Sequence, residues 1–314
     1  MKAVTFYEFG GPEVLRIEER PLRQPGPGEL AIAVSAAPIN PTDRLMLGGA
    51  QASTMTDLLP PFVAGMEFSG RVAATGEGVE LPVGTSVIGV CNPRTPSGGA
   101  QAQEIVVPAT YVAKIAANID LSSASTVPMN ALTAILALEM LGLAGGQTLL
   151  VTGGAGMLGS YAIQLARQAG LKVLANASDK DRDFLTAIGA DVVLPRDAGL
   201  EQKLRAACPE GVDGLIDGAL IGNEVSRFVR NGGGAISVRK SYRIDDPRLS
   251  VGYVSVAEGI GDPERIARIA KMLELGTLKP RVAPKGVFPF TKAAEAYAMA
   301  ERGGFRGRVV LTFD

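Results

Sequence analysis

The stretch from Gln147 to Gly159, QTLLVTGGAGMLG, decides the fold of this chain. It opens with an apolar run, Thr148 to Val151, that is short and partly β-branched, as expected of a buried strand. The run leads into a G-x-G-x-x-G spacing formed by Gly154, Gly156 and Gly159. A helical stripe of apolar residues comes next, consisting of Leu158, Ala162, Leu165 and Ala169. Strand, glycine turn and helix in this order predict a dinucleotide-binding unit whose helix N-terminus faces a pyrophosphate.

The glycine pattern alone would also fit a glycine-rich turn in any α/β protein. The strand before it, the helix after it and a second strand after Gly170 favour the dinucleotide interpretation. In this stretch the residues predicted to bind the cofactor are Gly154, Gly156, Met157, Leu158 and Gly159.

Composition limits the possible functions. The 314 residues allow about two domains, and 46% apolar with 20% charged residues predict a folded globular protein. A net charge of −1 gives no support for a nucleic acid or an anionic membrane as partner. The chain has no histidine, which excludes Ser-His-Asp catalysis, histidine proton relays and histidine-bound zinc.

The N-terminal segment and the cysteines predict a cytoplasmic protein. Met1 to Gly10 has the pattern of a strand and lacks the basic start and apolar core of a signal peptide. The most apolar stretch, Ala131 to Ala144, is too short to span a bilayer. Cys91 and Cys208 lie far apart in sequence and are expected to be buried apolar residues.

Two kinds of pattern divide the chain. Up to about Asn118, short strands alternate with glycine and proline turns, which is typical of a compact β-barrel-like domain. These strands are expected at Val4 to Phe6, Leu30 to Ser35, Gly70 to Ala74, Ser86 to Val90 and Gln103 to Val107. From Gln147 strands and helices alternate, which predicts a parallel sheet covered on both faces.

The last part of the alternating region adds an edge strand and a capped helix. Val251 to Val256 is predicted as the edge strand, and its pairing with a second copy predicts a homodimer. Asp262 is the expected N-cap of a helix that Gly276 ends. The strand from Arg308 to Phe313 is expected to return to the first domain.

Several segments together resemble the medium-chain dehydrogenase/reductase superfamily, and within it the zinc-free quinone oxidoreductase branch, whose zeta-crystallin-like members lack the catalytic metal. The resemblance covers essentially the whole chain and rests on Ala37–Asp43 (APINPTD), Pro61–Gly70 (PFVAGMEFSG), Ala131–Ala134 (ALTA), Gly153–Gly159 (GAGMLG after the first glycine) and Gly304–Leu311 (GFRGRVVL). It implies an α/β protein with a GroES-like β-barrel catalytic domain, residues 1–118 with 280–314. It also implies a Rossmann domain with a doubly wound parallel sheet, residues 119–279, that binds NADPH.

The resemblance suggests roles for three polar residues. Asn40 and Asp43 would lie beside the nicotinamide as catalytic residues, with the Asn40 amide near the cofactor or the substrate carbonyl. By themselves Asn40 also fits an Asn-Pro turn, and Asp43 also fits a helix cap. Thr133 fits a cofactor contact and a helix cap equally well.

The choice of cofactor depends on the end of the second strand. The family's acidic position falls on Ser178, and Lys180 and Arg182 follow it. A serine and two cations suit the 2′-phosphate of NADPH, although Asp179 could serve NADH or the charges could be a solvated loop. Ala219 and Val238 close the fourth and fifth strands and are predicted to line the cofactor site. Beyond the fifth strand, Tyr242 lies in a basic segment, Arg239, Lys240 and Arg243, expected to be mostly surface loop.

Departures from the superfamily pattern narrow the chemistry. The zinc alcohol dehydrogenases have a histidine where this chain has Met66, and the segment Arg44 to Leu47 has no tyrosine. We therefore expect a metal-free, NADPH-dependent reductase of quinones or α,β-unsaturated carbonyls, with water or a ribose hydroxyl open as proton source. The alternatives are an enoyl-thioester reductase of polyketide or lipid synthesis and, in another class, a catalytically silent NADPH-binding or redox-sensing protein.

Overall fold

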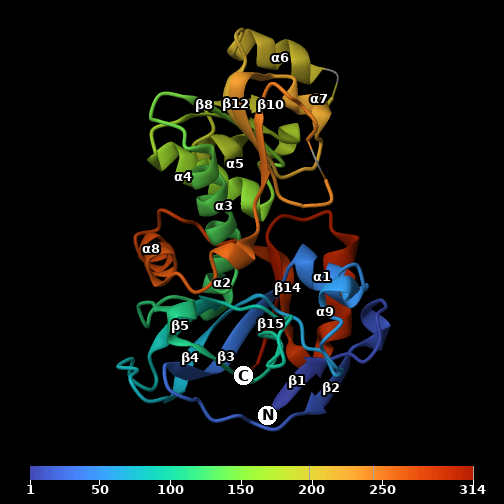
Figure 1. Ribbon diagram of the computed structural model, residues 1–314, viewed down its shortest axis with the longest axis vertical. Coiled ribbons are helices and arrows are strands. Elements are labelled where there is room, and N and C mark those ends of the chain that lie inside the picture. The colour runs from blue at the N-terminus through green and yellow to red at the C-terminus, as the bar shows by residue number, and fades with distance from the viewer. Residues whose placement is uncertain (198, 243, 314) are drawn as a thin grey trace. The chain divides into compact units, whose positions relative to one another are not determined.

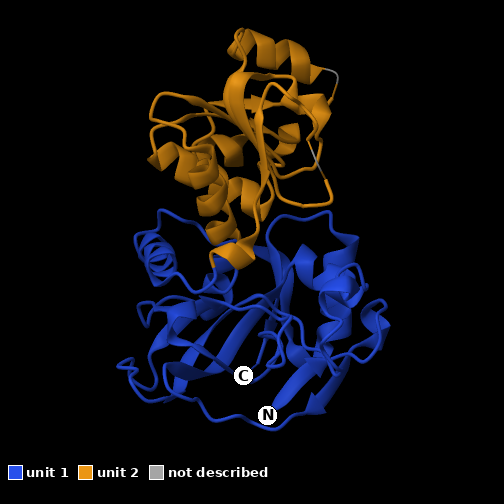
Figure 2. Ribbon diagram, viewed as in Figure 1, with its two compact units in different colours: residues 1–129, 260–314 blue, residues 130–259 orange. Residues whose placement is uncertain are grey.

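The computed structural model describes residues 1–197, 199–242 and 244–313. The chain forms two compact units, unit 1 with residues 1–129 and 260–314 and unit 2 with residues 130–259 (Figure 2). These boundaries differ from the predicted ones at 118/119 and 279/280. Residues 260–279 belong to unit 1 because α8 (Pro263–Glu274) contacts β7 (Val112–Lys114), and Glu274 accepts a hydrogen bond of 2.9 Å from the Ala116 backbone N–H.

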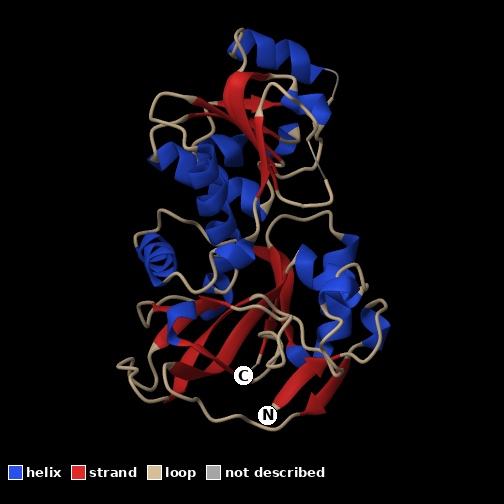
Figure 3. Cartoon of the chain, viewed as in Figure 1, coloured by secondary structure: helices blue, strands red, loops and turns tan. Residues whose placement is uncertain are grey.

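Unit 1 is built on a mostly antiparallel sheet (Figures 1 and 3). Its main path runs β14 (Val282–Pro289), β15 (Arg308–Thr312), β3 (Glu29–Ile39), β4 (Glu67–Thr75), β5 (Ser86–Val90) and β7. β6 (Glu104–Pro108) also pairs with β3, while β1 (Lys2–Thr5) and β2 (Arg16–Glu19) form a separate antiparallel pair. The helices of this unit besides α8 are α1 (Pro41–Leu47), α2 (Leu121–Ala124) and α9 (Ala293–Arg302).

The predicted return of the C-terminal strand is confirmed. β15 pairs antiparallel with β3, so that Val310 lies opposite Pro38. Large buried side chains fill the hydrophobic core of unit 1, among them Phe6, Phe68 and Tyr297. The strands β2, β7 and β14 were not predicted, because short or charged segments such as Arg16–Glu19 carry no clear alternation of apolar and polar residues.

Unit 2 is built on a parallel sheet. Its strand order is β10 (Val192–Leu194), β9 (Lys172–Asn176), β8 (Thr148–Thr152), β11 (Val212–Asp217), β12 (Val229–Ser237) and β13 (Ser250–Tyr253). The helices are α3 (Pro128–Leu141), α4 (Met157–Gln168), α5 (Arg182–Ala187), α6 (Gly199–Ala207) and α7 (Asn223–Ser226). This is the order 3-2-1-4-5-6 of the doubly wound nucleotide-binding fold, which confirms the predicted fold class.

The sheet of unit 2 is extended on both sides of β8, which is its first strand in the sequence. The chain passes from β8 to β9 on one side, and later reaches β11 on the other side of β8. Right-handed crossovers in both directions put helices on both faces of the sheet. Between β8 and β11 the strand order reverses, and ligands of such sheets bind beyond the carboxyl ends of the strands at this point.

Among the residues that the structure describes, one helical stretch is long and apolar enough to cross a membrane by length and composition. It runs from Leu121 to Leu141 and so includes α2 and α3. Its most apolar window is 72% buried inside the protein, which is what a core helix of a folded domain shows.

Candidate dinucleotide crevice and buried polar cluster

The glycine loop between β8 and α4 forms a close-packed backbone cradle. Gly156 is the N-cap of α4 and is exposed, and its N–H donates to the Gly153 carbonyl at 2.9 Å. A Cβ on Gly159 would lie 2.4 Å from the Gly153 oxygen and 2.8 Å from the Gly154 Cα, so only glycine fits there. The first N–H groups of α4 have no acceptor within the helix. A backbone cradle at a helix N-terminus suits a diphosphate, and the residues therefore fit a dinucleotide.

The predicted determinants of the 2′-phosphate lie at the same edge of the sheet. Thr152 at the end of β8 pairs in register with Asn176 at the end of β9, and Ser178 follows two residues later. Lys180 is exposed. Arg182 forms an ion pair of 2.7 Å with Asp179, and their side chains are 45% and 73% exposed. This exposed pair leaves Arg182 able to exchange its partner, since such pairs contribute about 0–1 kcal/mol.

The remaining predicted contacts fall at or after strand ends. Ala219 is exposed two residues beyond β11, and Val238 directly follows β12. Thr133 lies in the second turn of α3, which begins at Pro128, so the alternative role of Thr133 as a helix cap is wrong. Tyr242 lies over Gly222, where an added Cβ would be 3.0 Å from the tyrosine ring. Its neighbour Arg243 lies outside the described residues.

A groove of about 910 Å³ opens at this edge of unit 2. Residues from the ends of β9, β10 and β11 contribute to it, including Asn176, Arg196 and Ala219. Arg196, which was not among the predicted site residues, follows β10 by two residues, is exposed and lines the groove. The position of the groove agrees with a nucleoside bound beyond the carboxyl ends of the strands.

In unit 1, Asn40 and Asp43 belong to a fully buried polar cluster. Asn40 is the N-cap of α1, and Asp43 closes a capping box by accepting the Asn40 N–H at 2.7 Å. The other Asp43 oxygen accepts the Gly65 N–H at 3.0 Å. Glu67 accepts the Asn40 side-chain amide at 2.8 Å and the Met129 N–H, in the first turn of α3, at 2.7 Å.

Burial sets the protonation of this cluster. It raises the pKa of Asp43 to about 6, against the lowering effect of the Asn40 and Gly65 N–H groups. It raises the pKa of Glu67 to about 7, against the lowering effect of hydrogen bonds from Asn40 and Met129. The Arg308 charge lowers both pKa values, while the Asp43 charge raises that of Glu67. Protons therefore bind to this cluster near neutral pH.

These contacts change the interpretation of Asn40 and Asp43. Both side chains are 0% exposed, and the Asn40 amide already holds Glu67. This burial does not fit the predicted donation from Asn40 to a substrate oxygen, and the hydrogen bonds of the two residues connect α1 to Gly65 and to β4. Glu67 was not predicted as a site residue, although it lies within the segment Pro61–Gly70 on which the family resemblance rests. The feature of the sequence that could have indicated this role is an acidic residue, Glu67, at the first position of the buried strand β4.

The residues around Met66 do not fit a zinc ion. Met66 is buried and offers only a thioether, a soft ligand. Burial raises the pKa of the Cys91 thiol to about 12, and this thiol donates to the Gly65 carbonyl at 3.4 Å. A zinc site needs thiolate, imidazole or carboxylate ligands. Among the described residues no cluster of three or more histidine, cysteine, aspartate or glutamate side chains could hold a metal.

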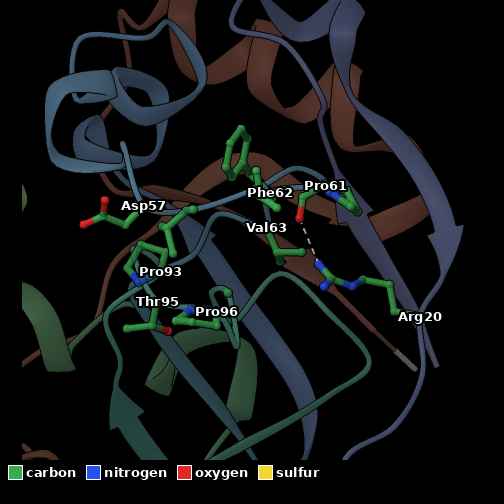
Figure 4. Close-up of a pocket in the computed structure, with 11 residues that line it drawn as sticks. Arg20, Asp57, Pro61, Phe62, Val63, Pro93, Thr95 and Pro96 are labelled. Atoms are coloured by element: carbon green, nitrogen blue, oxygen red, sulfur yellow. Dashed lines mark hydrogen bonds between the residues drawn. The ribbon is translucent and has the colours of Figure 1, made fainter.

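A cavity of about 270 Å³ in unit 1 lies apart from the predicted site residues (Figure 4). Its lining includes Arg20, Asp57, Phe62 and Pro93, and Arg20 donates to the Pro61 carbonyl at 3.1 Å. In Figure 4 the Asp57 carboxylate and the Arg20 guanidinium group lie on opposite sides of the lining. The two charged groups thus do not converge on one ligand position.

Comparisons with known proteins agree with this geometry. Residues 26–117 match the family model of the alcohol dehydrogenase GroES-like domain, and residues 188–311 match that of zinc-binding dehydrogenases. The chain belongs to the medium-chain dehydrogenase/reductase superfamily. It is therefore a member of a family of nicotinamide-dependent oxidoreductases, and the family resemblance stated from its sequence is confirmed.

Individual relatives cover nearly the whole chain. The 2-methylene-furan-3-one reductase of Solanum lycopersicum is 29% identical over 99% of this chain and 79% of its own length. The chloroplastic NADPH-dependent alkenal/one oxidoreductase of Arabidopsis thaliana is 28% identical over the same shares. The structure of the quinone oxidoreductase from Coxiella burnetii superposes with a TM-score of 0.85 at 26% identity, covering 99% of both chains.

Proposed function

We propose that this protein is a metal-independent, NADPH-dependent reductase of quinones or α,β-unsaturated carbonyl compounds. The observation that carries the proposal is the glycine cradle of unit 2, which lies at the reversal point of the parallel sheet and admits no side chain at Gly159. Such a cradle binds the diphosphate of a dinucleotide. The substrate class is supported by relatives named for reducing an enone, alkenals or quinones.

The cofactor choice follows from charge at the end of β9. Ser178 stands at the position where a carboxylate would bind the ribose 2′-hydroxyl of NADH, the cation of Lys180 follows two residues later, and the Asp179 carboxylate between them is paired with Arg182. When bound, the nicotinamide supplies a hydride to an electrophilic carbon. The residues of this chain that would hold the cofactor are the N–H groups of α4 and the cations of the loop after β9. Reduction of an enone also takes up one proton, which we assign to water, because the acids beside Asn40 are fully buried.

Metal independence follows from the donor atoms. An alcohol must lose a proton to be oxidised, and zinc enzymes assist this by coordinating its oxygen. A quinone or an enone is already an electrophile and needs no such ion. Met66, a protonated Cys91 and the hydrogen-bonded Glu67 offer no suitable zinc ligands, so reduction of an electrophile fits this chain better than alcohol oxidation.

We also propose a homodimer formed through β13. This strand is the edge of the unit 2 sheet, and Val251 and Tyr253 are 41% and 38% exposed. An apolar strand edge invites pairing unless something covers it. A second copy related by a two-fold axis would cover it.

The direct experiment is NADPH oxidation by enzyme purified with a chelator. Substrates should include a quinone, an alkenal, a cyclic enone and an enoyl thioester, with a simple alcohol and NADP⁺ as the reverse test. Turnover of the quinone or the enones is expected. Turnover confined to the thioester would support the alternative function in polyketide or lipid synthesis. Tight NADPH binding without turnover of any compound would support the silent redox-sensing alternative.

A further inference from the structure

The buried carboxylate of Asp217 lies at the reversal point of the unit 2 sheet and is not used by the proposed chemistry. It is 0% exposed and ends β11, directly opposite Thr152 at the end of β8. One of its oxygens accepts the Thr152 hydroxyl at 2.5 Å and the Ile221 N–H at 3.1 Å. The other accepts the Gly222 N–H at 2.7 Å. Three donors from two segments thus converge on one carboxylate.

Thr152 completes the link between the two strand ends. While its hydroxyl donates to Asp217, its oxygen accepts the Ala219 N–H at 3.0 Å. The loop 218–222 is therefore fixed at three backbone N–H groups, those of residues 219, 221 and 222. It contains Leu220 with φ +58°, a left-handed conformation that a leucine keeps only where the surrounding structure holds it. The carboxylate and the hydroxyl are the groups that impose it.

The fixed loop lies against the glycine loop. A Cβ on Gly153 would be 3.3 Å from the Ala219 N and 3.4 Å from the Gly218 carbonyl carbon. Ala219 and Ile221 also line the 910 Å³ groove. A change in the loop would therefore alter both the wall of the groove and the packing of the glycine cradle.

We propose that Asp217, together with Thr152, is a positioning residue that holds the loop 218–222 in the conformation required to bind the dinucleotide. The inference rests on the proposed function, because NADPH is the ligand of the groove and the cradle. Asp217 itself has no exposed surface and acts through the backbone of residues 219 to 222. It therefore determines cofactor affinity without touching the cofactor.

The same strand offers a matched control at its other end. Asp213 in β11 accepts the Thr148 N–H at 2.7 Å and the Arg230 guanidinium at 2.6 Å. It thus also joins β11 to β8 through a carboxylate, but at the amino edge of the sheet. Asp213→Asn removes a comparable structural contact far along the strand from the groove.

The test measures the NADPH dissociation constant by fluorescence titration, with the melting temperature of the cofactor-free protein measured in parallel. Asp217→Asn is expected to raise the dissociation constant at least about tenfold, the loss of one hydrogen bond to a charged group. Asp213→Asn is expected to lower the melting temperature about as much as Asp217→Asn does. Its NADPH dissociation constant should stay within about twofold of the wild-type value. In steady state, the KM for NADPH should rise in Asp217→Asn while kcat stays within about twofold.

A gentler pair of variants decides the question if Asp217→Asn does not fold. Thr152→Val, which keeps the shape but removes the hydroxyl, should weaken NADPH binding, and Thr152→Ser should restore it. Unchanged NADPH affinity in folded Asp217→Asn or in Thr152→Val, or equal weakening in Asp213→Asn, would overturn the inference and leave the proposed function standing. Failure of the wild-type protein to bind NADPH or NADH would overturn both.

Discussion

The side-chain amide of Asn40 donates to a carboxylate oxygen of Glu67 over 2.8 Å, with both side chains completely buried. This bond joins the start of α1 to the start of β4, and the second Glu67 oxygen accepts from Met129 at the start of α3. Three segments that are distant in sequence therefore meet at one glutamate.

Removing the amide should destabilise the protein. Asn40→Ala leaves an oxygen of a buried carboxyl without its donor, which costs roughly 1–3 kcal/mol in the free energy of unfolding. Urea denaturation measures this loss, and Asn118→Ala, an exposed asparagine of the same unit, is the control. If Asn40→Ala instead kept wild-type stability and lost turnover at saturating NADPH, the originally expected contact of Asn40 with the substrate would be favoured over a positioning role.

The raised pKa values make stability depend on pH. The pKa of Glu67 rises from 4.5 to about 7 and that of Asp43 from 3.8 to about 6, so the folded state holds protons that the unfolded chain has released. Their contribution to the free energy of unfolding is complete below the unfolded pKa values and is lost as the pH rises through 6 and 7. The wild-type protein should therefore lose stability between pH 5 and pH 8, relative to Glu67→Gln, by roughly 1–3 kcal/mol.

Urea titrations of both proteins at several pH values measure this difference. The low pKa of Glu29, about 2 because of Arg23 and the Gly26 N–H, lies outside the window and does not interfere. If the stability of the wild-type protein relative to Glu67→Gln stays flat or rises toward pH 8, the Glu67 carboxyl is ionised throughout this range, contrary to the effect of its burial.

Cofactor preference should depend on Lys180. Removing its charge in Lys180→Ala is expected to weaken NADPH binding about tenfold, the equivalent of one charge-assisted hydrogen bond, and to leave NADH binding unchanged. Fluorescence titrations with both cofactors measure the effect, with Lys203→Ala on the exposed face of α6 as the control. Equal weakening for both cofactors would show that Lys180 does not contact the 2′-phosphate. A wild-type preference for NADH would contradict the proposed use of NADPH.

The strand edge should determine the oligomeric state. Replacing Val251 and Tyr253 together by lysine puts two charges on the exposed edge strand and should convert a dimer into a monomer. Light scattering coupled to size-exclusion chromatography reports the mass directly. A wild-type protein that is already monomeric at micromolar concentration would rule out the proposed pairing of β13.

The sequence was sufficient to predict the parts of the fold that have a strong local pattern. The cradle around Gly159 could be predicted because its glycine spacing stands between an apolar strand and an amphipathic helix. The cap of α8 could be predicted from Asp262 before Pro263, and the Asp262 side chain accepts from the N–H groups of residues 264 and 265. Each of these features is formed by neighbouring segments of the chain.

Features that depend on distant segments could not be predicted. Glu67 meets Asn40 and Met129 only after the sheet of unit 1 has formed, and Asp217 meets Thr152 across 65 residues. The compact units divide the chain at other residues than predicted, because nothing local in residues 260–279 shows that α8 contacts β7. The homodimer, the cytoplasmic location and the preference for NADPH stay predictions.

Isotope labelling tests directly whether NADPH transfers a hydride to an enone without a metal ion. The chelator-treated enzyme is supplied with NADPH carrying deuterium at nicotinamide C4, in separate samples for each face of the ring, together with an α,β-unsaturated ketone. We expect a saturated ketone with deuterium at its β-carbon from one of the two cofactors, formed at a rate that added zinc does not increase. Product formed only after zinc is restored, or product without deuterium from either labelled cofactor, would contradict it.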